Sequence, residues 1–426
     1  MGSSIAVIGT GYVGLTTGAC LAHLGHDVVC ADIDAEKIDR LSRGEVPILE
    51  AGLEAIVREG LQSGRLRFVV GAAEAVGDAE FVYLCVPTPQ SPDGSADLSY
   101  IDAAAREIAP HLMPSAIVIN KSTVPVGSTR FVEQSLGRSD VFVVSNPEFL
   151  REGSAVTDFL HPDRVIIGSD DQSAAIRVAG LYLNIRAPLM VTDPASAETI
   201  KYASNAFLAT KLSFVNAIAA LCEAVGADVN DVVLGMGYDK RIGHEFLRPG
   251  PGWGGSCFPK DLRALLYLAR EAGYHFGLLE GVISVNIEQF DRVAAKIARM
   301  AGTIEGATVA VWGLTFKANT DDLRESPSLE IISRLIRGGA TVQAYDPTVR
   351  GSLDRFPELR ICDDPYAACD GADVLAVLTE WDEFKWLDLD KVAELMRQRR
   401  VVDGRNLLDR GVLIRRGFLY EGIGRS

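Results

Sequence analysis

Ile5-Ala6-Val7-Ile8-Gly9-Thr10-Gly11-Tyr12-Val13-Gly14 places a glycine-rich turn between an apolar run and a segment of helical periodicity. The apolar run predicts a buried strand, and apolar residues recur at helical spacing beyond the turn. In that context the first glycine permits the turn, the second lets a pyrophosphate approach the backbone, and the third allows close packing of helix on strand. A negative phosphate then meets the helix N-terminus. The stretch predicts a dinucleotide site whose cofactor contacts are Gly9, Gly11, Tyr12, Val13 and Gly14.

A second apolar run, Val28–Ala31, ends at Asp32, where a carboxylate is expected to bind the ribose hydroxyls of the cofactor. Its charge would repel a ribose 2′-phosphate, and Ile33 and Asp34 supply no arginine to hold one, so NAD is favoured over NADP. Lys37 is the nearest cation, and it serves either as a cofactor contact or as a solvated helix residue. An ordinary tight turn is the alternative interpretation of the glycines, but it leaves Asp32 unexplained.

Length, charge and cysteine usage exclude several classes of protein. A chain of 426 residues exceeds what one core usually supports, so more than one domain is expected. The 42 basic and 57 acidic residues give a net charge of −15 without a long basic run, which argues against nucleic acid or an anionic membrane as the main partner. The seven scattered cysteines form no C-x-x-C pair or zinc-like cluster, so they predict no metal site and fit a reducing cytosol.

The start of the chain carries no targeting signal that we recognise. The first residues lead into the apolar run without a basic region, so no secretion signal is expected. No apolar stretch reaches the roughly 20 residues that a membrane helix needs. The sequence therefore predicts a soluble, cytoplasmic protein.

The order of apolar segments predicts the architecture. Short apolar runs alternate with helical segments over residues 1–196 and again over 301–426, which is typical of parallel sheets with crossover helices. Between them, Ala197–Ala224 is apolar nearly all the way round and predicts a buried helix. The expected fold is α/β, with two Rossmann-like doubly wound parallel-sheet domains joined by a central helical region, residues 197–300. Gly313–Lys317 lacks the second and third glycines of the motif, so a second dinucleotide is not expected there.

Gly254-Gly255-Ser256-Cys257-Phe258-Pro259-Lys260-Asp261 brings one cysteine to a predicted helix start. Pro259 suits a first helical turn, because its missing N–H would be unpaired there anyway. A thiol normally has a pKa of about 8.5, and both a helix N-terminus and a neighbouring ammonium such as Lys260 favour its charged form. The pattern indicates either a reactive thiolate or a small buried cysteine in a tight turn.

Several other polar residues stand in unusual places. Lys201 and Asn205 are spaced i, i+4 on the apolar central helix, so they form a structural pair or face a functional cavity. Asn120–Pro125 and Asn146–Glu152 follow apolar runs, where sites gather in parallel sheets, although both could be turn residues. Cations at predicted strand or loop ends suit phosphates, or are solvated surface charge: Lys317, Arg324 and Arg405.

Taken in order, these motifs resemble the nucleotide-sugar dehydrogenases of the UDP-glucose/GDP-mannose dehydrogenase family, and the resemblance runs through the whole chain. The residues that carry it are Gly9–Gly14, Lys121–Pro125, Asn146–Glu152, Lys201 with Asn205, and Gly254–Asp261. The resemblance implies an NAD-binding domain over residues 1–196, a helical dimerisation region with a catalytic cysteine over 197–300, and a domain that holds the UDP-sugar over 301–426.

The resemblance also implies roles for individual residues. Cys257 resembles the nucleophile, and Asp261 the carboxylate that assists proton transfer and water. Lys201, helped by Asn205, matches the lysine that steadies negative charge on the oxygen at C6. Thr123 and Glu148 match residues that organise the catalytic water and protons.

The resemblance also implies contacts with the cofactor, with the substrate and with a partner subunit. Further cofactor contacts would be Pro87, Thr88, Thr123, Glu152, Lys260 and Arg324. Substrate contacts would be Glu148, Phe149, Leu150, Lys201, Asn205, Arg241, Phe246, Arg248, Gly254, Cys257, Phe316, Lys317 and Arg405. Arg241 resembles an arginine that the neighbouring subunit contributes, which implies a homodimer.

The implied reaction is the oxidation of a primary alcohol to an acid, with two NAD reduced in turn. Cys257 would add to the intermediate aldehyde, and water would hydrolyse the resulting thioester. Asp158–Arg164 and Arg241–Leu247 are similar to the UDP-glucose branch of the family rather than to the GDP-mannose or UDP-N-acetylmannosamine branches. Three alternatives remain: a GDP-mannose dehydrogenase, a two-electron dehydrogenase of small 3-hydroxy acids, and an NAD-binding redox sensor with Cys257 as its oxidisable thiol.

Overall fold

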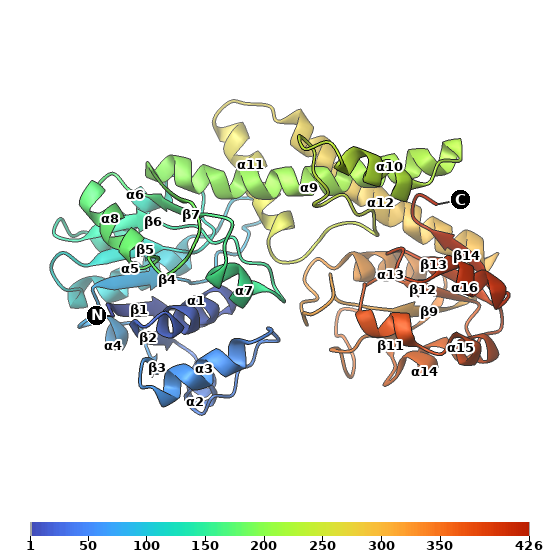
Figure 1. Ribbon diagram of the computed structural model, residues 1–426, viewed down its shortest axis with the longest axis horizontal. Helices are drawn as coiled ribbons and strands as arrows, with labels where there is room; N and C mark the ends of the chain where they lie inside the picture. The colour runs from blue at the N-terminus through green and yellow to red at the C-terminus, as the bar shows by residue number, and fades with distance from the viewer. Residues whose placement is uncertain (1, 426) are drawn as a thin grey trace. The chain divides into compact units, whose positions relative to one another are not determined.

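The computed structural model describes residues 2–425. The chain divides into two compact units, here called the first unit (Met1–Ser204 with Arg263–Tyr274) and the second unit (Asn205–Leu262 with His275–Ser426). The division falls within the long helix α9 (Pro194–Val225) and within α11 (Phe258–Glu271). Figure 1 shows the chain coloured from its N-terminus to its C-terminus. The three-part division drawn from the sequence stays a prediction.

The first unit is built on an eight-stranded sheet in the order β3-β2-β1-β4-β5-β6-β7-β8. Its strands are β1 (Ser4–Ile8), β2 (Asp27–Asp32), β3 (Leu66–Val70), β4 (Phe81–Leu84), β5 (Ile117–Asn120), β6 (Phe142–Ser145), β7 (Val165–Gly168) and β8 (Leu189–Thr192). Neighbouring strands are parallel except for the single antiparallel pairing of β6 with β7. The order of the first six strands is that of a dinucleotide-binding fold.

Helices cover both faces of this sheet. Successive side chains of each strand point to opposite faces, so apolar residues on both faces need a covering layer. Ile5 and Val7 enter the core cluster that includes residues of α1 (Tyr12–His23) and α3 (Leu53–Gln62). Ala6 and Ile8 enter the cluster that includes residues of α5 (Ser99–Ile108) and α6 (Ser128–Leu136). The helices are α1 (Tyr12–His23), α2 (Ala35–Ser42), α3 (Leu53–Gln62), α4 (Ala73–Val76), α5 (Ser99–Ile108), α6 (Ser128–Leu136), α7 (Ala155–Leu160) and α8 (Gln172–Gly180). This double covering explains why the strands are nearly continuous apolar runs.

The second unit contains a six-stranded, fully parallel sheet in the order β11-β10-β9-β12-β13-β14, which repeats the strand order of the dinucleotide-binding fold. Its strands are β9 (Thr308–Trp312), β10 (Thr341–Tyr345), β11 (Arg360–Ile361), β12 (Val374–Val377), β13 (Arg400–Asp403) and β14 (Leu419–Gly422). Its other helices are α10 (Val229–Gly237), α12 (Gly277–Ala301), α13 (Pro327–Arg337), α14 (Pro365–Cys369), α15 (Leu389–Leu395) and α16 (Arg410–Arg415). The predicted fold class is confirmed.

Helix α9 departs from the prediction that it is buried all round. Large apolar side chains along it are exposed in the isolated chain: Phe207 at 65%, Phe214 at 49%, Leu221 at 56% and Val225 at 67%. By length and composition α9 is also the one helix within residues 2–425 that could cross a membrane, so the prediction that no segment is long enough does not hold by that measure. The same test is passed by core helices of soluble proteins, so it is weak evidence for a membrane span.

Candidate active site

The glycine-rich turn after β1 leaves the space that a pyrophosphate needs. Gly9 has φ of 95°, and a Cβ there would lie 2.7 Å from the carbonyl oxygen of Cys85, so the position requires glycine. A Cβ at Gly14 would collide with the carbonyl oxygen of Gly9. A Cβ on Gly11, by contrast, would meet nothing within 4 Å, and Gly11 provides no side-chain cap for α1. The first amides of α1 therefore face an open cradle that fits a dinucleotide phosphate.

Asp32 at the end of β2 is held ready to accept hydrogen bonds from a ribose. Its carboxylate accepts from the Thr10 hydroxyl at 2.6 Å, the Thr10 amide at 2.9 Å and the Lys37 ammonium at 2.9 Å. Burial acts to raise the pKa of Asp32, but these donors outweigh it and lower the pKa to about 2. Asp32 is therefore ionised at neutral pH. Lys37 pairs with it, and the role of Lys37 as a cofactor contact stays a prediction. Ile33 beside Asp32 is 85% exposed and offers an apolar surface.

The loops after β4 and β5 are tied together at the same end of the sheet. The Thr88 hydroxyl donates to the carbonyl oxygen of Thr123 at 2.8 Å, and the Ser122 hydroxyl donates to that of Val86 at 2.7 Å. Pro87 and Thr88, predicted as cofactor contacts, are thus placed beside Thr123. Open parallel sheets bind ligands at the carboxyl ends of their strands, and these loops lie there.

A buried ion pair joins the loop after β6 to α9. The Lys201 ammonium lies 2.8 Å from Glu148 Oε1, and their side chains are only 5% and 4% exposed. Glu148 Oε2 accepts from the Leu150 amide at 2.7 Å, and the Thr123 hydroxyl lies 3.5 Å from Glu148 Oε1. Burial acts to raise the pKa of Glu148, but Lys201 and the Leu150 amide, with a smaller contribution from Lys121, lower it. The structure therefore brings together three predicted catalytic residues and keeps the carboxylate ionised.

The aromatic ring of Phe149 lies under two cations of the first unit. The Lys201 ammonium is 5.5 Å from the ring centroid, and the Arg164 guanidinium is 3.9 Å from it. Such contacts attract a cation to the ring face and limit the positions it can take. Phe149, predicted as a substrate contact, is thus also part of the support of Lys201.

Tyr12 has a contact that the sequence did not predict. Its hydroxyl donates to the buried carboxylate of Glu50, and the Gly153 amide lies 2.9 Å from the Tyr12 hydroxyl and 2.7 Å from Glu50 Oε2. Burial and Glu50 together raise the pKa of Tyr12, so the hydroxyl keeps its proton. The cluster fastens the segment that carries Glu152 to the first turn of α1. No spacing rule links Glu50 to either partner, so sequence reasoning missed it.

In the second unit, Cys257 lies at the start of α11 beside a buried carboxylate. The Asp261 amide donates to the Cys257 carbonyl oxygen at 2.9 Å, so Cys257 immediately precedes the helix as predicted. Asn205 Nδ2 donates to Asp261 Oδ2 at 2.6 Å, and the Lys260 ammonium lies 3.3 Å from Asp261 Oδ1, although not with hydrogen-bond geometry. Asp261 is only 1% exposed. Of the seven cysteines in residues 2–425, Cys257 alone is not buried.

The glycines before Cys257 pack closely against the loop after β9. A Cβ on Gly255, which has φ of 83°, would lie 2.8 Å from the Phe316 ring, and a Cβ on Gly254 would collide with the carbonyl oxygen of Glu325. The Gly255 amide also donates to the Arg324 carbonyl oxygen at 3.1 Å. Larger side chains at either glycine would separate the cysteine turn from the loop that carries Phe316 and Lys317.

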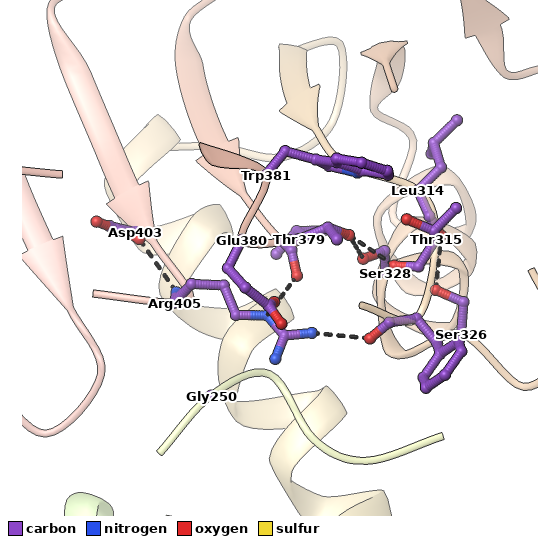
Figure 2. A network of polar contacts seen from close by, with 12 residues as sticks. Gly250, Leu314, Thr315, Ser326, Ser328, Thr379, Glu380, Trp381, Asp403 and Arg405 are labelled. Atoms are coloured by element: carbon purple, nitrogen blue, oxygen red, sulfur yellow. Dashed lines mark hydrogen bonds and ion pairs between the residues drawn. The ribbon is translucent and has the colours of Figure 1, made fainter. Parts of the chain in front are cut away.

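Arg405 lies within a polar network at the ends of β12 and β13 (Figure 2). Its guanidinium donates to the carbonyl oxygens of Leu378 at 2.8 Å and Phe316 at 3.0 Å, and it pairs with Glu380 at 2.9 Å. Two of its three guanidinium nitrogens therefore hold loops together, which the prediction of a direct substrate contact did not anticipate. Glu380 was missed because it lies 25 residues from Arg405, beyond any local spacing rule.

The second unit repeats the dinucleotide fold but lacks a free ribose-binding carboxylate. Asp346 follows β10 as Asp32 ends β2, yet it is fully buried. It accepts from the Leu314 and Thr315 amides at 2.8 and 3.1 Å and from the Trp381 indole at 3.1 Å. Asp346 therefore differs from Asp32, whose side chain remains 14% exposed, because a fully buried carboxylate is not accessible to a ribose.

The remaining predicted contacts are exposed or partly exposed. Arg324 pairs with Asp322 through two 2.8 Å contacts, and Arg241 pairs with Asp239 while its side chain is 88% exposed. Arg248 is exposed, and Phe246 adopts a positive φ of 60°. The Lys317 ammonium lies 5.3 Å from the Phe316 ring centroid. Within residues 2–425 no group of three or more His, Cys, Asp or Glu side chains is arranged to hold a metal ion.

Three models of one protein family match successive stretches of the chain. Models of the UDP-glucose/GDP-mannose dehydrogenase family match residues 3–186 (NAD binding domain), 195–288 (central domain) and 310–410 (UDP binding domain). The chain is 47% identical over 440 residues to UDP-glucose 6-dehydrogenase from Pseudomonas aeruginosa, covering 99% of this chain and 97% of that protein.

Solved structures agree with that assignment. A UDP-glucose dehydrogenase from the archaeon Pyrobaculum islandicum matches with a TM-score of 0.90 and 38% identity, covering 100% of this chain and 98% of that one. A GDP-mannose dehydrogenase from Pseudomonas aeruginosa matches with a TM-score of 0.54 and 31% identity, covering 99% of each chain. The match to the NAD binding domain confirms NAD as the cofactor. The chain is thus an NAD-dependent oxidoreductase that belongs to the UDP-glucose/GDP-mannose dehydrogenase family.

Proposed function

We propose that the protein oxidises UDP-glucose to UDP-glucuronate, with two NAD reduced for each sugar and with Cys257 as the nucleophile. The observation that carries the proposal is Cys257 itself, the one cysteine of residues 2–425 that is not buried, placed at a helix start four residues before the buried Asp261. The 47% identical relative from Pseudomonas aeruginosa bears the name of this activity, and the family model over residues 310–410 describes a UDP binding domain.

In the proposed reaction, named residues of the chain would act between the two oxidations. NAD held by the glycine turn Gly9–Gly14 and Asp32 would supply the hydride acceptor for C6 in each of them. After the first, the Cys257 thiolate adds to the aldehyde carbon, and the Lys201 ammonium balances the negative charge that develops on the aldehyde oxygen. After the second, C6 is held as a thioester. Water then attacks this carbon, gives its protons to a carboxylate such as Asp261 or Glu148, and releases the Cys257 thiolate and the acid.

Counting NADH against substrate tests this function. Purified protein with NAD and limiting UDP-glucose should yield two NADH for each sugar, and UDP-glucuronate as the only sugar product. One NADH for each substrate would mean a two-electron dehydrogenase. Turnover of GDP-mannose but not of UDP-glucose would mean that the protein is a GDP-mannose dehydrogenase. Peroxide sensitivity without any sugar-dependent NADH would favour the redox sensor.

We also propose that the protein is a homodimer that joins through α9 and α10. Phe207, Phe214, Leu221 and Val225 recur at intervals of seven, seven and four residues, so they form one apolar stripe on α9. Tyr238, just after α10, adds a side chain that is 72% exposed. Contiguous exposed apolar surface of this kind is typical of protein interfaces. The all-apolar composition of α9 is explained if a second copy covers the stripe.

Arg241 supplies the test of that dimer. Its 88% exposed side chain is compatible with a role in the active site of a neighbouring subunit. In that case Cys257→Ala and Arg241→Ala, each inactive alone, should recover up to about a quarter of wild-type activity when their subunits are mixed and exchanged, because half of the dimers then hold one complete site of two. A Phe214→Glu variant should have the mass of one chain in light scattering. Failure of the mixture to recover activity would place Arg241 in its own subunit's site.

We place the protein in the cytoplasm. None of the seven cysteines within residues 2–425 forms a disulfide in the structure, and six of them are buried. A reducing compartment keeps such cysteines unpaired, which supports this location.

A further inference from the structure

Lys121 is a buried ammonium that the proposed mechanism leaves unexplained. It follows β5, is 5% exposed, and is the residue two positions before Thr123. Its ammonium donates to Asn146 Oδ1 at 3.1 Å, which is the one hydrogen bond that the structure records for its three N–H groups within residues 2–425. Burying an ammonium with so few partners is costly, so a role that repays the cost is to be expected.

Asn146 fixes the position of this ammonium. It lies after β6, two residues before Glu148, and is 1% exposed. Its Nδ2 donates to the carbonyl oxygen of Ile166 at 2.7 Å, so its Oδ1 is turned toward Lys121. The same Oδ1 accepts from the Tyr182 hydroxyl at 2.6 Å, and that hydroxyl lies 3.2 Å from the hydroxyl of Tyr83. The contact between Lys121 and Asn146 therefore joins the ends of β5 and β6, which carry Thr123 and Glu148.

The charges around Lys121 come from each element packed against it. Burial opposes the charged form of Lys121 most strongly, Glu148 after β6 favours it, and Lys201 on α9 opposes it. The Phe159 ring of α7 lies 5.9 Å from the ammonium, and Tyr83 and Tyr182 approach through Asn146. Burial is the largest influence and lowers the pKa of Lys121 to about 8, so the group is charged at pH 7. Burial likewise raises the pKa of Cys85 to about 12 and keeps that of both tyrosines high, so these neighbours remain neutral.

We propose that Lys121 is a positioning residue of the active site: through its hydrogen bond to Asn146 it braces the strand ends that carry Thr123 and Glu148, and it is a second buried cation, besides Lys201, in this part of the first unit. Lys201 contacts Glu148 directly, but its charge is also needed for the oxygen of the substrate. When the Lys201 ammonium interacts with the oxygen of the substrate, the positive charge of Lys121 still offsets the negative charge of Glu148. This inference rests on the proposed function, in which Glu148 accepts a proton.

Two variants distinguish the effect of the hydrogen bond to Asn146 from the effect of the positive charge of Lys121. Lys121→Gln removes the charge but keeps an N–H group that can donate to Asn146, whereas Lys121→Met removes both. Each should raise the pKa of Glu148 and shift the acidic limb of the kcat–pH profile upward by about one pH unit. Lys121→Met should in addition lower kcat by about tenfold relative to Lys121→Gln, because Thr123 and Glu148 lose their fixed spacing.

Lys296→Met is the matched control. Lys296 is also buried, at 6% exposed, but its ammonium pairs with Glu223 at 2.8 Å and donates to the Gly422 carbonyl oxygen at 3.0 Å. Losing it should destabilise the protein without moving the acidic limb. An acidic limb that stays in place in both Lys121 variants, or that moves equally in Lys296→Met, would overturn the proposal.

A second measurement does not depend on turnover. Lys121 has a folded pKa of about 8, below its ordinary value of 10.5, so the unfolded chain binds more protons in this range and folding becomes more favourable as pH rises from about 8 to about 10.5. The urea midpoint of the wild type should therefore rise relative to that of Lys121→Gln over this interval. If UDP-glucose is not oxidised at all, the proposed function fails while this comparison still tests the buried ammonium. Parallel midpoints across the interval would show that Lys121 is not held as inferred.

Discussion

Cys257→Ala is expected to abolish the formation of UDP-glucuronate from UDP-glucose and NAD. Without the thiolate no thioester can form, so the second oxidation has no covalent intermediate to act on. We expect the rate of acid formation to fall by at least about 10³-fold, which chromatography of the nucleotide sugars would measure. The variant should fold normally, since Cys257 is partly exposed and its removal leaves no buried cavity.

Cys222→Ala provides the control for this experiment. Cys222 is in the same unit but is 4% exposed and packs in the apolar core, so its loss should cost stability rather than chemistry. Cys257→Ser adds a second measurement. The serine alkoxide is a poorer leaving group than the cysteine thiolate, so the ester intermediate should accumulate and its covalent sugar adduct should be visible by mass spectrometry. Acid formation at the wild-type rate in Cys257→Ala would remove this residue from the mechanism.

The fold could be predicted because its determinants are local. The glycine turn requires backbone conformations that only its own residues set, and a Cβ at Gly9 would meet Cys85 as the motif implies. Strands buried on both faces must be continuous apolar runs, so their positions could be predicted in the first unit and again in the second. Asp346 shows the limit of such reasoning, because only the structure reveals that this carboxylate is already occupied.

Helix α9 was misjudged for a physical reason. Apolar residues on all sides of a helix indicate that every side is covered, but not whether the cover comes from the same chain. Phe207 and Val225 are exposed in the single chain, and the proposed dimer would cover them. Composition cannot distinguish a core helix from an interface helix.

The site could be predicted as a set of residues but not as a set of contacts. Glu148 and Lys201 are 53 positions apart, and Lys121 and Asn146 are 25 apart. These pairings depend on the order of the strands in the sheet and on the position of α9. Neither can be deduced from the spacing of residues along the sequence. Asn205 could be associated with Lys201 by helical spacing, yet its hydrogen bond to Asp261 belongs to the tertiary fold.

Lys201→Met is expected to damage both stability and catalysis, and the two effects can be separated. The substitution leaves the Glu148 carboxylate buried without its ammonium, which should lower the free energy of unfolding by about 3–5 kcal/mol. It also removes the positive charge for the developing oxyanion, which should lower kcat by about 10²–10³-fold. Because a lone buried carboxylate takes up a proton more readily, the loss of stability should be smaller at pH 5 than at pH 8.

The double variant Lys201→Met with Glu148→Leu decides between a structural pair and a functional one. It replaces the buried ions with apolar side chains, so urea unfolding should show most of the lost stability recovered. Turnover of UDP-glucose should stay low, because neither the charge for the oxyanion nor the proton acceptor is restored. Recovery of both stability and turnover would instead mean that the pair only holds α9 to the loop after β6. The buried position of the pair makes the distinction measurable, since an exposed pair would contribute too little stability to follow.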